Sequence, residues 1–403
     1  IIAERLGSVK VFWYNRVKHT KGAVSVKEIP RRYWRNLDIP LILAVFGLFL
    51  LGLFAIYSAS ASRLLNLNSN PFHYVKRQAI AACVGLVGLI TVISIDYRVW
   101  RRWTKVGYLF TVLLLGATLV AGKISQGSQR WFSLGGFNLQ PSEIAKIVII
   151  VVLAHYLEKP GSIQGKKIII PFLLIAVPMA LIILQPDLGT SIVFVGIVFA
   201  MTYTAGGNVR HLGIIALVGS AVALAAILLS YYGVVVLLED YQLRRLLVFL
   251  DPYSDPTGSG WNVIQSMIAI GSGGFLGKGY LNGTQSQLLF LPANHTDFIF
   301  SVAAEEFGFV GASAILLTYA FLIWRGIKIA MLAKDRFGSL LAVGCVGYFS
   351  CHLIINVGMT VGIMPVTGLP LPFLTYGGST LLTSLLAVGI LLNVGLRRQK
   401  IMF

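Results

Sequence analysis

The stretch IPLILAVFGLFLLGLFAIYSASAS, residues 39–62, contains no charged side chain. Because a helix needs about 20 mostly apolar residues to cross the hydrocarbon core of a bilayer, this stretch predicts a transmembrane helix. Of the 403 residues in the chain, 56% are hydrophobic and 12% are charged, whereas about a quarter of a soluble domain is charged. The stretch is long and follows a basic segment, so we expect it to stay in the membrane and not to be cleaved as a signal peptide. The sequence predicts an integral membrane protein.

Apolar stretches of similar length recur along the chain and predict an all-α fold with about ten transmembrane helices. We expect a membrane domain at residues 39–396, with basic cytoplasmic tails at 1–38 and 397–403. The predicted spans are 39–62, 76–95, 104–121, 142–157, 168–184, 188–204, 212–236, 298–324, 339–363 and 379–396.

The basic residues predict how these helices are oriented. With a cytoplasmic N-terminus, 24 of the 33 Lys and Arg residues fall on the cytoplasmic side and 8 on the outer side, while Lys146 lies within a span. This bias fits the positive-inside rule, so both termini are expected in the cytoplasm. The net charge of +18 then reflects topology. Nucleic-acid binding is not indicated, because the basic residues are spread over short loops and form no basic domain.

The motifs of metal and nucleotide enzymes do not fit this sequence. Cys83, Cys345 and Cys351 fall within predicted spans, and their spacing suggests neither a disulfide framework nor a zinc site. The glycine-rich GSGGFLGKG, residues 271–279, matches neither the Walker pattern nor G-x-G-x-x-G. A nucleotide-driven motor is therefore not indicated.

One predicted outer connection, residues 237–296, is much longer than the others. Loops of this length are usually functional or disordered, and this one is too apolar for disorder. Its stretch WNVIQSMIAI, residues 261–270, predicts a helix that either lies on the outer leaflet or packs over the bundle. In both cases the glycine-rich segment after it is expected at the mouth of a cavity. The apolar face of this helix is predicted to consist of Val263, Ile264, Met267 and Ile268.

Three predicted spans begin at the outer face with similar short motifs. LQPSE at 139–143 and LQPDLGTS at 184–191 place Pro141 and Pro186 in a first helical turn, and HTDF at 295–298 begins the third span. The positive ends of three helices would then face outward, where they would stabilise an anion such as a phosphate. The alternative is that these are ordinary helix starts, since half the helices of any such bundle begin outside.

Charged residues near these helix starts are the main functional signal. Glu143 and Lys146 lie three residues apart on one helix face, so they either pair or line a polar cavity. Asp187 is either a first-turn residue favoured by the helix dipole or part of an anion site. Asp297 follows the long outer segment directly, at the lip of a span, where a substrate can reach it.

Further polar and aromatic residues in these stretches have two possible roles each. Trp131 either belongs to the aromatic belt at the membrane surface or stacks on a sugar, with Arg130 beside it binding a phosphate. Glu305 and Glu306, inside a predicted span, are expected in the polar interior of the bundle.

Four sequence blocks, in order, resemble the signature blocks of the SEDS family, which is named for shape, elongation, division and sporulation. The resemblance covers nearly the whole chain from about residue 38 and is stronger to the elongation branch than to the division branch. Two departures are the long basic N-terminal tail and the threonines at 375 and 380, where serines are common. The blocks are GSQRWFSLGGFNLQPSEIAKI (127–147), LQPDLGTS (184–191), GSGGFLGKGYLNGTQSQLLFLPANHTDFIFSVAAEEFGFVG (271–311) and NVGMTVGIMPVTGLPLPFLTYGGST (356–380).

The resemblance implies a peptidoglycan glycosyltransferase that polymerises lipid II at the outer face of the bacterial cytoplasmic membrane. It implies a class B penicillin-binding protein as a partner, Asp297 as the catalytic carboxylate, and functional importance for Trp131, Glu143 and Lys146. A divalent cation, Mg²⁺ or Mn²⁺, is implied for the diphosphate chemistry, but no pattern identifies its ligands. The residues expected around the substrate are Arg130, Trp131, Glu143, Lys146, Asp187, Lys278, His295, Thr296 and Ser379.

The chemistry of the residues is compatible with that activity. A single carboxylate can act as general base for a sugar hydroxyl, while a diphosphate leaves without a general acid once Arg130, Lys146, Lys278 or a metal neutralises its charge. The lipid chains would lie between helices on the bilayer side.

Two other classes of function stay open. A lipid II flippase would favour inverted repeats with a site at the midplane, and a non-catalytic scaffold would leave the outer charges unexplained. Four glycines in the predicted eighth and ninth spans also predict a surface on which a partner's transmembrane helix packs. They are Gly308, Gly311, Gly344 and Gly347.

Overall fold

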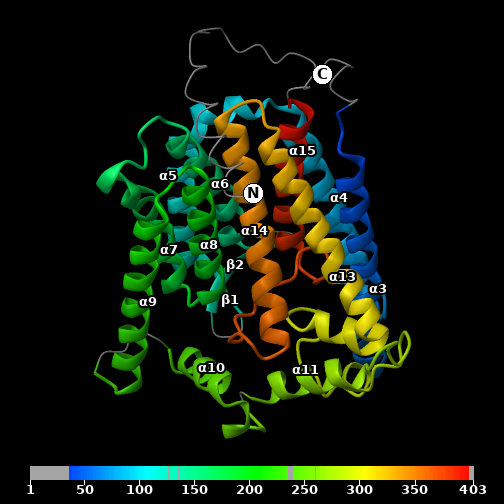
Figure 1. Cartoon of the computed structure of the whole chain (residues 1–403). Coiled ribbons are helices and arrows are strands. Elements are labelled where there is room, and N and C mark those ends of the chain that lie inside the picture. The colour runs from blue at the N-terminus through cyan, green and yellow to red at the C-terminus, as the bar shows by residue number, and fades with distance from the viewer. Residues whose placement is uncertain (1–35, 126–127, 135–136, 235–238, 259, 399–403) are drawn as a thin grey trace.

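The computed structural model describes residues 36–125, 128–134, 137–234, 239–258 and 260–398. Within them, ten helices of 15 to 33 residues form a bundle (Figure 1). Each of the ten coincides with one predicted span to within a few residues, except that α13 extends beyond its span by seven. These helices are α3 (Ile39–Asn66), α4 (His73–Ser94), α5 (Trp100–Ala121), α6 (Pro141–Leu157), α7 (Ile170–Leu184), α8 (Leu188–Thr204), α9 (Val209–Tyr231), α13 (Ile299–Met331), α14 (Arg336–Thr360) and α15 (Gly378–Leu396).

Eight of these helices are long and apolar enough to cross a membrane, if α5 and α7 are counted with the short 3-10 helices η1 (Tyr97–Val99) and η2 (Gly165–Ile169) that precede them. The other two, α6 and α8, have 17 residues each and are about 25 Å long. The prediction of a helical integral membrane protein is confirmed, and eight of the ten predicted spans meet the length and composition for crossing.

The centre of the bundle is formed by α14 and α15 (Figure 1). In α15, 16 of 19 residues are buried, whereas α9 at the edge buries only Leu212. A helix that is apolar on all sides is stable at such an edge only if lipid surrounds it. The start of α3 and the end of α15 lie at the same end of the bundle, where Asn36 Nδ2 donates to Leu396 O at 3.3 Å. The predicted tails lie almost wholly outside the described residues.

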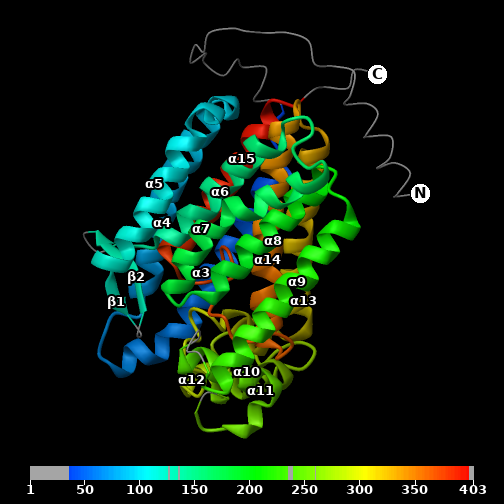
Figure 2. The same cartoon turned by 90° about the vertical axis from the view of Figure 1, so that its left-hand side faces the viewer.

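A small antiparallel sheet lies between α5 and α6 in sequence and was not predicted. It consists of β1 (Lys123–Ser125), β2 (Ser128–Leu134) and β3 (Phe137–Leu139) in the order β1-β2-β3. Figure 2 shows β1 and β2 beside the end of α5. The missed signal is the pair Gly135–Gly136 in the sequence between the short polar and aromatic stretches of β2 and β3, which is a hairpin pattern.

The segment predicted to lie outside, in its described residues 239–258 and 260–296, forms four short helices at the end of the bundle where α13 begins (Figures 1 and 2). In α11, predicted from WNVIQSMIAI, Val263 and Ile264 are buried while Ile268 is exposed. The hydroxyl of Ser266 in α11 lies 2.6 Å from Ser301 Oγ in α13 and donates to Thr360 O in α14 at 2.7 Å. The contacts therefore favour the packing alternative over a helix on the leaflet. The four helices are α10 (Asp240–Leu250), η3 (Pro252–Ser254), α11 (Trp261–Ser272) and α12 (Thr284–Gln287).

The glycine-rich segment after α11 fills a break in α13. At Gly308 the backbone leaves the helical region, with φ of 64° and ψ of −163°, so the usual helical hydrogen bonds are interrupted. The turn replaces them with bonds from Lys278 N to Glu305 O, Gly279 N to Glu306 O, Phe309 N to Gly274 O and Val310 N to Phe275 O, at 2.9 to 3.2 Å. Backbone groups at membrane depth need such partners from the protein itself. The glycines thus serve close backbone packing.

Candidate active site

Asp297 lies in a turn between α12 and α13, with its side chain partly exposed. The turn is closed by Thr296 N and Phe298 N, which both donate to Ala293 O. Burial raises the pKa of the Asp297 carboxyl, while the positive charge of Arg245 and a hydrogen bond from Thr296 lower it; the effect of burial is the largest. A carboxylate with a raised pKa is a stronger proton acceptor than an ordinary aspartate.

Arg245, on α10, is the cation beside Asp297, and the sequence analysis did not select it. Its Nη1 donates to Val366 O at 3.4 Å. A methyl group built on Gly368 would lie 3.4 Å from Asp297 Oδ2 and 4.0 Å from Arg245 Nη1. The two charged groups therefore meet over Gly368, and Arg245 is exposed to solvent.

His295, two residues before Asp297, is held by aromatic rings. Its ring stacks on Tyr74 at 4.7 Å between centroids and lies 6.0 Å from the ring of Tyr376. Burial and the charge of Arg63 lower the pKa of His295 to about 4. The imidazole is therefore neutral near pH 7 and adds no positive charge to the site.

The irregular 366–377 segment between α14 and α15 forms the wall of the site next to Asp297. Much of it is buried, including Leu371, Phe373 and Leu374, so its backbone polar groups need partners within the protein. Side chains from four helices supply them. Arg245 is hydrogen-bonded to Val366 O, Asn356 to Leu369 O, His352 to Pro370 O, Tyr319 to Pro372 O, and Gln78 to both Thr375 O and Gly377 N.

Glu143 and Lys146 form the predicted pair, with Lys146 Nζ 2.7 Å from Glu143 Oε1. Both side chains are buried, Lys146 fully. Lys146 Nζ also lies 3.0 Å from His352 Nε2, and His352 Nδ1 lies 2.8 Å from Pro370 O. An ammonium can only donate, so Nε2 accepts and Nδ1 donates. The pair thus reaches the 366–377 segment through His352 and is not exposed to a cavity.

Arg130 and Asp187 form a second cluster, beside the first turn of α10. Arg130, on β2, donates to Gln185 O at 2.7 Å and to Pro186 O, and lies 3.4 Å from the hydroxyl of Tyr241. Tyr241 is on α10, one turn before Arg245, whose guanidinium lies 5.5 Å from the Tyr241 ring. Helix α10 therefore connects the Arg130 cluster to Asp297.

Asp187 is the N-cap of α8, just before the first turn in which it was predicted, and Pro186, also predicted in that turn, precedes the helix. Its Oδ1 accepts from Thr190 N at 3.1 Å, and its Oδ2 accepts from Gln140 Nε2 at 3.1 Å. Arg130 Nη1 lies 4.0 Å from Oδ1. With its oxygens engaged in this way, Asp187 organises the helix start.

The remaining predicted residues occupy separate places. Trp131 follows Arg130 on β2 and is half-buried. Ser379, at the start of α15, donates to Asn138 O at 2.7 Å and accepts from Gln140 N at 3.0 Å, so it joins the sheet to the bundle. Lys278 Nζ lies 2.7 Å from Oε1 of the fully buried Glu305. Among the described residues, Lys278 thus forms its ion pair with this carboxylate.

The described part of the chain contains no cluster of three or more His, Cys, Asp or Glu side chains that could hold a metal ion. The carboxylate at the site is Asp297, with the cation Arg245 beside it. Asp297 and Arg245 do not by themselves supply the ligands of a metal site.

Residues 39–400 match the sequence pattern of a family described as cell cycle protein, which comprises FtsW, RodA and SpoVE. The chain belongs to the FtsW/RodA/SpoVE family. This family is the one that the sequence blocks resemble.

Two relatives in this family show how far the similarity extends. The chain is 39% identical over 362 residues to stage V sporulation protein E of Bacillus subtilis, covering 89% of this chain and 96% of the relative. It is 38% identical over 375 residues to the probable peptidoglycan glycosyltransferase FtsW of Trichlorobacter lovleyi, covering 91% and 96%. Because a sporulation protein and an FtsW match equally well, these identities do not single out the elongation branch.

One solved structure is similar to this chain in both fold and sequence. It comes from work on the structural coordination of polymerization and crosslinking by a peptidoglycan synthase complex. The TM-score is 0.72 at 33% identity, covering 89% of this chain and 97% of the solved chain.

Proposed function

We propose that this protein is a peptidoglycan glycosyltransferase that polymerises lipid II at the outer face of the bacterial cytoplasmic membrane, with Asp297 as general base. The observation that carries this proposal is the place of Asp297. It is a partly buried carboxylate with a raised pKa at the start of α13, next to the exposed guanidinium of Arg245.

In the proposed reaction the 4-hydroxyl of one sugar attacks the anomeric carbon of another. The new bond joins that oxygen to the carbon, the bond from the carbon to the diphosphate oxygen breaks, and the hydroxyl proton passes to Asp297. A base within hydrogen-bonding reach contributes about 100-fold to 10,000-fold to such a step. Arg245 is placed to stabilise the negative charge on the departing diphosphate. Arg130, which is on β2 and contacts Tyr241 in the first turn of α10, would bind a second phosphate of the lipid substrates.

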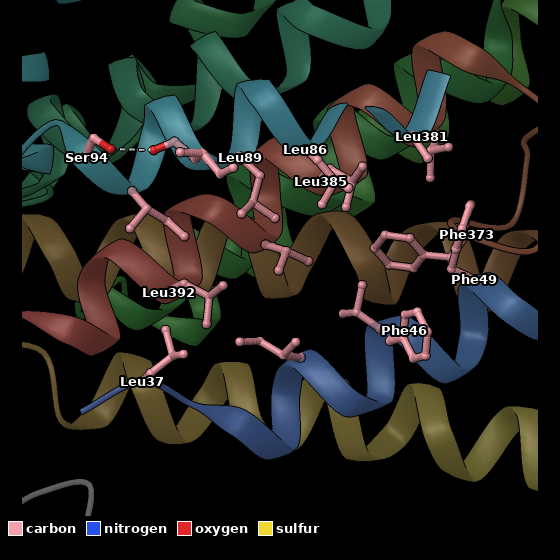
Figure 3. A pocket seen from close by; sticks show the side chains of 16 residues that line it. Leu37, Phe46, Phe49, Leu86, Leu89, Ser94, Phe373, Leu381, Leu385 and Leu392 are labelled. Carbon is pink, nitrogen blue, oxygen red and sulfur yellow. Dashed lines mark hydrogen bonds between the residues drawn. The ribbon is translucent and has the colours of Figure 1, made fainter. Parts of the chain in front are cut away.

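The lipid part of the substrate would lie on the bilayer side of the bundle. An apolar groove of about 360 Å³ lies between α3, α4 and α15, and Figure 3 shows the side chains that line it. Phe46 and Leu86 line it, and Phe373 of the 366–377 segment lies at one end. Ser94, the polar residue in its lining, already donates to Ile90 O. The groove therefore suits a hydrocarbon chain and offers nothing to a headgroup.

Mg²⁺ or Mn²⁺ is proposed as the divalent cation, bound mainly by the diphosphate and water. Mg²⁺ usually takes one or two carboxylates and keeps several waters, so one protein carboxylate is compatible with it. No step above depends on this ion.

The partner is proposed to be a class B penicillin-binding protein, because the similar solved chain comes from a complex that couples polymerization to crosslinking. The role is proposed to be cell elongation, because LNGTQSQLLFLP at 281–292 and GMTVGIMPVTGLPLPFLTYGGST at 358–380 resemble the elongation branch more than the division branch. Expression of this protein in a strain depleted of its elongation member of the family should restore rod shape. In a strain depleted of its division member it should not restore division, and this pair of results would support the role in elongation.

A lipid II flippase is the second candidate, because α13 is interrupted at Gly308 and interrupted helices often mark transport sites. The interruption here is bridged by four backbone hydrogen bonds between the 274–279 turn and α13. Two of them already occupy Glu305 O and Glu306 O, the carbonyls just before the break, which an ion or substrate would otherwise use. The deciding experiment mixes the purified protein and its partner with lipid II and separates the products by gel. Glycan polymer supports the proposed enzyme, and lipid movement without polymer supports the flippase.

A further inference from the structure

Asn356, on α14, is fully buried and uses its side-chain amide for two hydrogen bonds. Its Nδ2 donates to Asp297 O at 3.0 Å and to Leu369 O at 2.7 Å. An amide nitrogen has two hydrogens, so both are engaged. The two accepting carbonyls are 72 residues apart in sequence and belong to the two segments that form the site.

These two segments determine where the charged groups lie. One carries the Asp297 carboxylate. The other, the 366–377 segment, presents Gly368 to that carboxylate and holds Arg245 through Val366 O. The distance between the Asp297 and Arg245 charges therefore depends on how the segments are joined. One direct backbone bond joins them, from Tyr376 N to His295 O at 3.1 Å, and among the described residues the side chain of Asn356 bonds to both segments next to Asp297 itself.

A purely structural role is the alternative, because buried carbonyls need donors wherever they occur. The chain provides a matched case for comparison. Asn393, on α15, is also fully buried, and its Nδ2 donates to Val92 O and Ile95 O. These two carbonyls lie where α4 ends, at the opposite end of the bundle from Asp297.

We propose that Asn356 is a positioning residue for glycosyl transfer, which sets the place of Asp297 relative to Arg245 by bonding to Asp297 O and Leu369 O. This inference rests on the proposed function. Asn356 does not contact substrate and acts only through the two segments. Its amide is buried with the backbone it holds, so the geometry is fixed before substrate binds. Such prearrangement contributes to rate, because a misplacement of about 1 Å can cost about 100-fold.

The test compares Asn356→Leu with Asn393→Leu, which have the same volume change and each remove two donors. Asn393→Leu also removes the side-chain oxygen that accepts from Arg397 Nη1. Both variants should therefore unfold at a lower temperature than the wild type, Asn393→Leu by at least as much as Asn356→Leu. With lipid II as substrate, Asn356→Leu should lose about 10-fold to 100-fold in kcat with KM within about threefold. Asn393→Leu should keep kcat within about threefold of the wild type.

If Asn356→Leu does not fold, Asn356→Asp replaces it, since it keeps the shape and, when protonated, donates one bond where the amide donates two. It should fold and still lose about 10-fold in kcat. Wild-type kcat in the folded variant, or an equal loss in Asn393→Leu, would overturn the positioning role. A wild type that makes no polymer overturns the proposed function itself, whereas an active wild type with an equally active Asn356 variant overturns only this inference.

Discussion

The carboxylate of Asp297 and the guanidinium of Arg245 face the same small space beside Gly368, where an added methyl would lie 3.4 Å from Asp297 Oδ2 and 4.0 Å from Arg245 Nη1. Arg245 holds its place through Val366 O and is solvent-exposed, while Asp297 is partly buried. A carboxylate and a cation thus lie close together before the start of α13, as the proposed mechanism requires of a base and of a group that stabilises a leaving anion.

Asp297→Asn removes the proton acceptor while keeping the shape of the side chain. Polymerisation should fall by about 100-fold to 10,000-fold, with expression and thermal unfolding near those of the wild type. Glycan product from lipid II, separated by gel at matched protein levels, measures the effect.

The control for this variant is Glu306→Gln, since Glu306 is buried in α13 and accepts from the Ser58 hydroxyl. It should change the stability in detergent at least as much as the rate. Near-normal polymer from Asp297→Asn would remove Asp297 from the mechanism.

Arg245→Met should shift the pH dependence of polymerisation. The base acts only when deprotonated, so activity rises with pH through the pKa of Asp297. Arg245 lowers that pKa; without it the pKa rises further, and the acid limb of the profile moves to higher pH. Initial rates across a pH series for wild type and variant give the two midpoints. An unmoved midpoint, whatever the loss in maximal rate, would mean that Arg245 does not act on the Asp297 carboxyl.

Gly308→Ala should destabilise the protein strongly. The φ of 64° at this position strains any residue with a β-carbon, and the added methyl would collide with the backbone of Gly277. Gly116→Ala is the matched control, because that glycine is in α5 and a methyl there would have no atom within 4 Å. The control should be neutral or more stable by up to about 1 kcal/mol. Thermal unfolding in detergent compares them, and equal transitions would refute the tight docking at the break.

Lys278→Met should affect stability more than turnover, because it leaves the fully buried Glu305 without its cation. Removing one partner of a buried pair costs about 3 kcal/mol. The double variant Lys278→Met/Glu305→Gln should recover most of this loss, since glutamine can still accept from Thr284 Oγ1 and Gln285 N, which now bond to Glu305. If turnover falls in Lys278→Met without a change in unfolding temperature, Lys278 binds substrate as the sequence suggested.

The long outer segment should face the cell exterior. Single cysteines at Ser254 and Asn282, both exposed, should react with an impermeant thiol reagent in intact spheroplasts of a strain whose protein lacks the native cysteines. A cysteine at Lys334, exposed at the opposite end between α13 and α14, should react only after permeabilisation. The reverse pattern would invert the proposed orientation.

The helices could be predicted because each is a long apolar stretch, and length alone identifies such stretches. The sheet was missed, since its strands are short and the Gly135–Gly136 pair between β2 and β3 was not interpreted as a hairpin signal. Arg245 was missed for a different reason. It follows another arginine in the 237–296 segment, which was interpreted mainly for its helix at 261–270, and its nearness to Asp297 depends on the folding of the 366–377 segment.

The interpretation of glycines was partly wrong. Gly344 and Gly347 were predicted to receive a partner's helix, but both are buried. A methyl at Gly344 would press on Ile150, and one at Gly347 would lie 3.4 Å from Ala200. These glycines bring α14 close to α6 and α8. Small residues show from the sequence that two helices approach each other closely, but not which helix is the neighbour.

The hydrogen bonds between the 274–279 turn and α13 have a consequence for how this chain tolerates changes in length. The four bonds pair two stretches in a fixed register, so one residue inserted between Gly274 and Gly279 would misalign donors and acceptors on one side of the break. Residues 251–258, exposed along most of their length, carry no such constraint. An insertion scan should therefore tolerate added residues around η3 and reject them a short distance along the same outer segment.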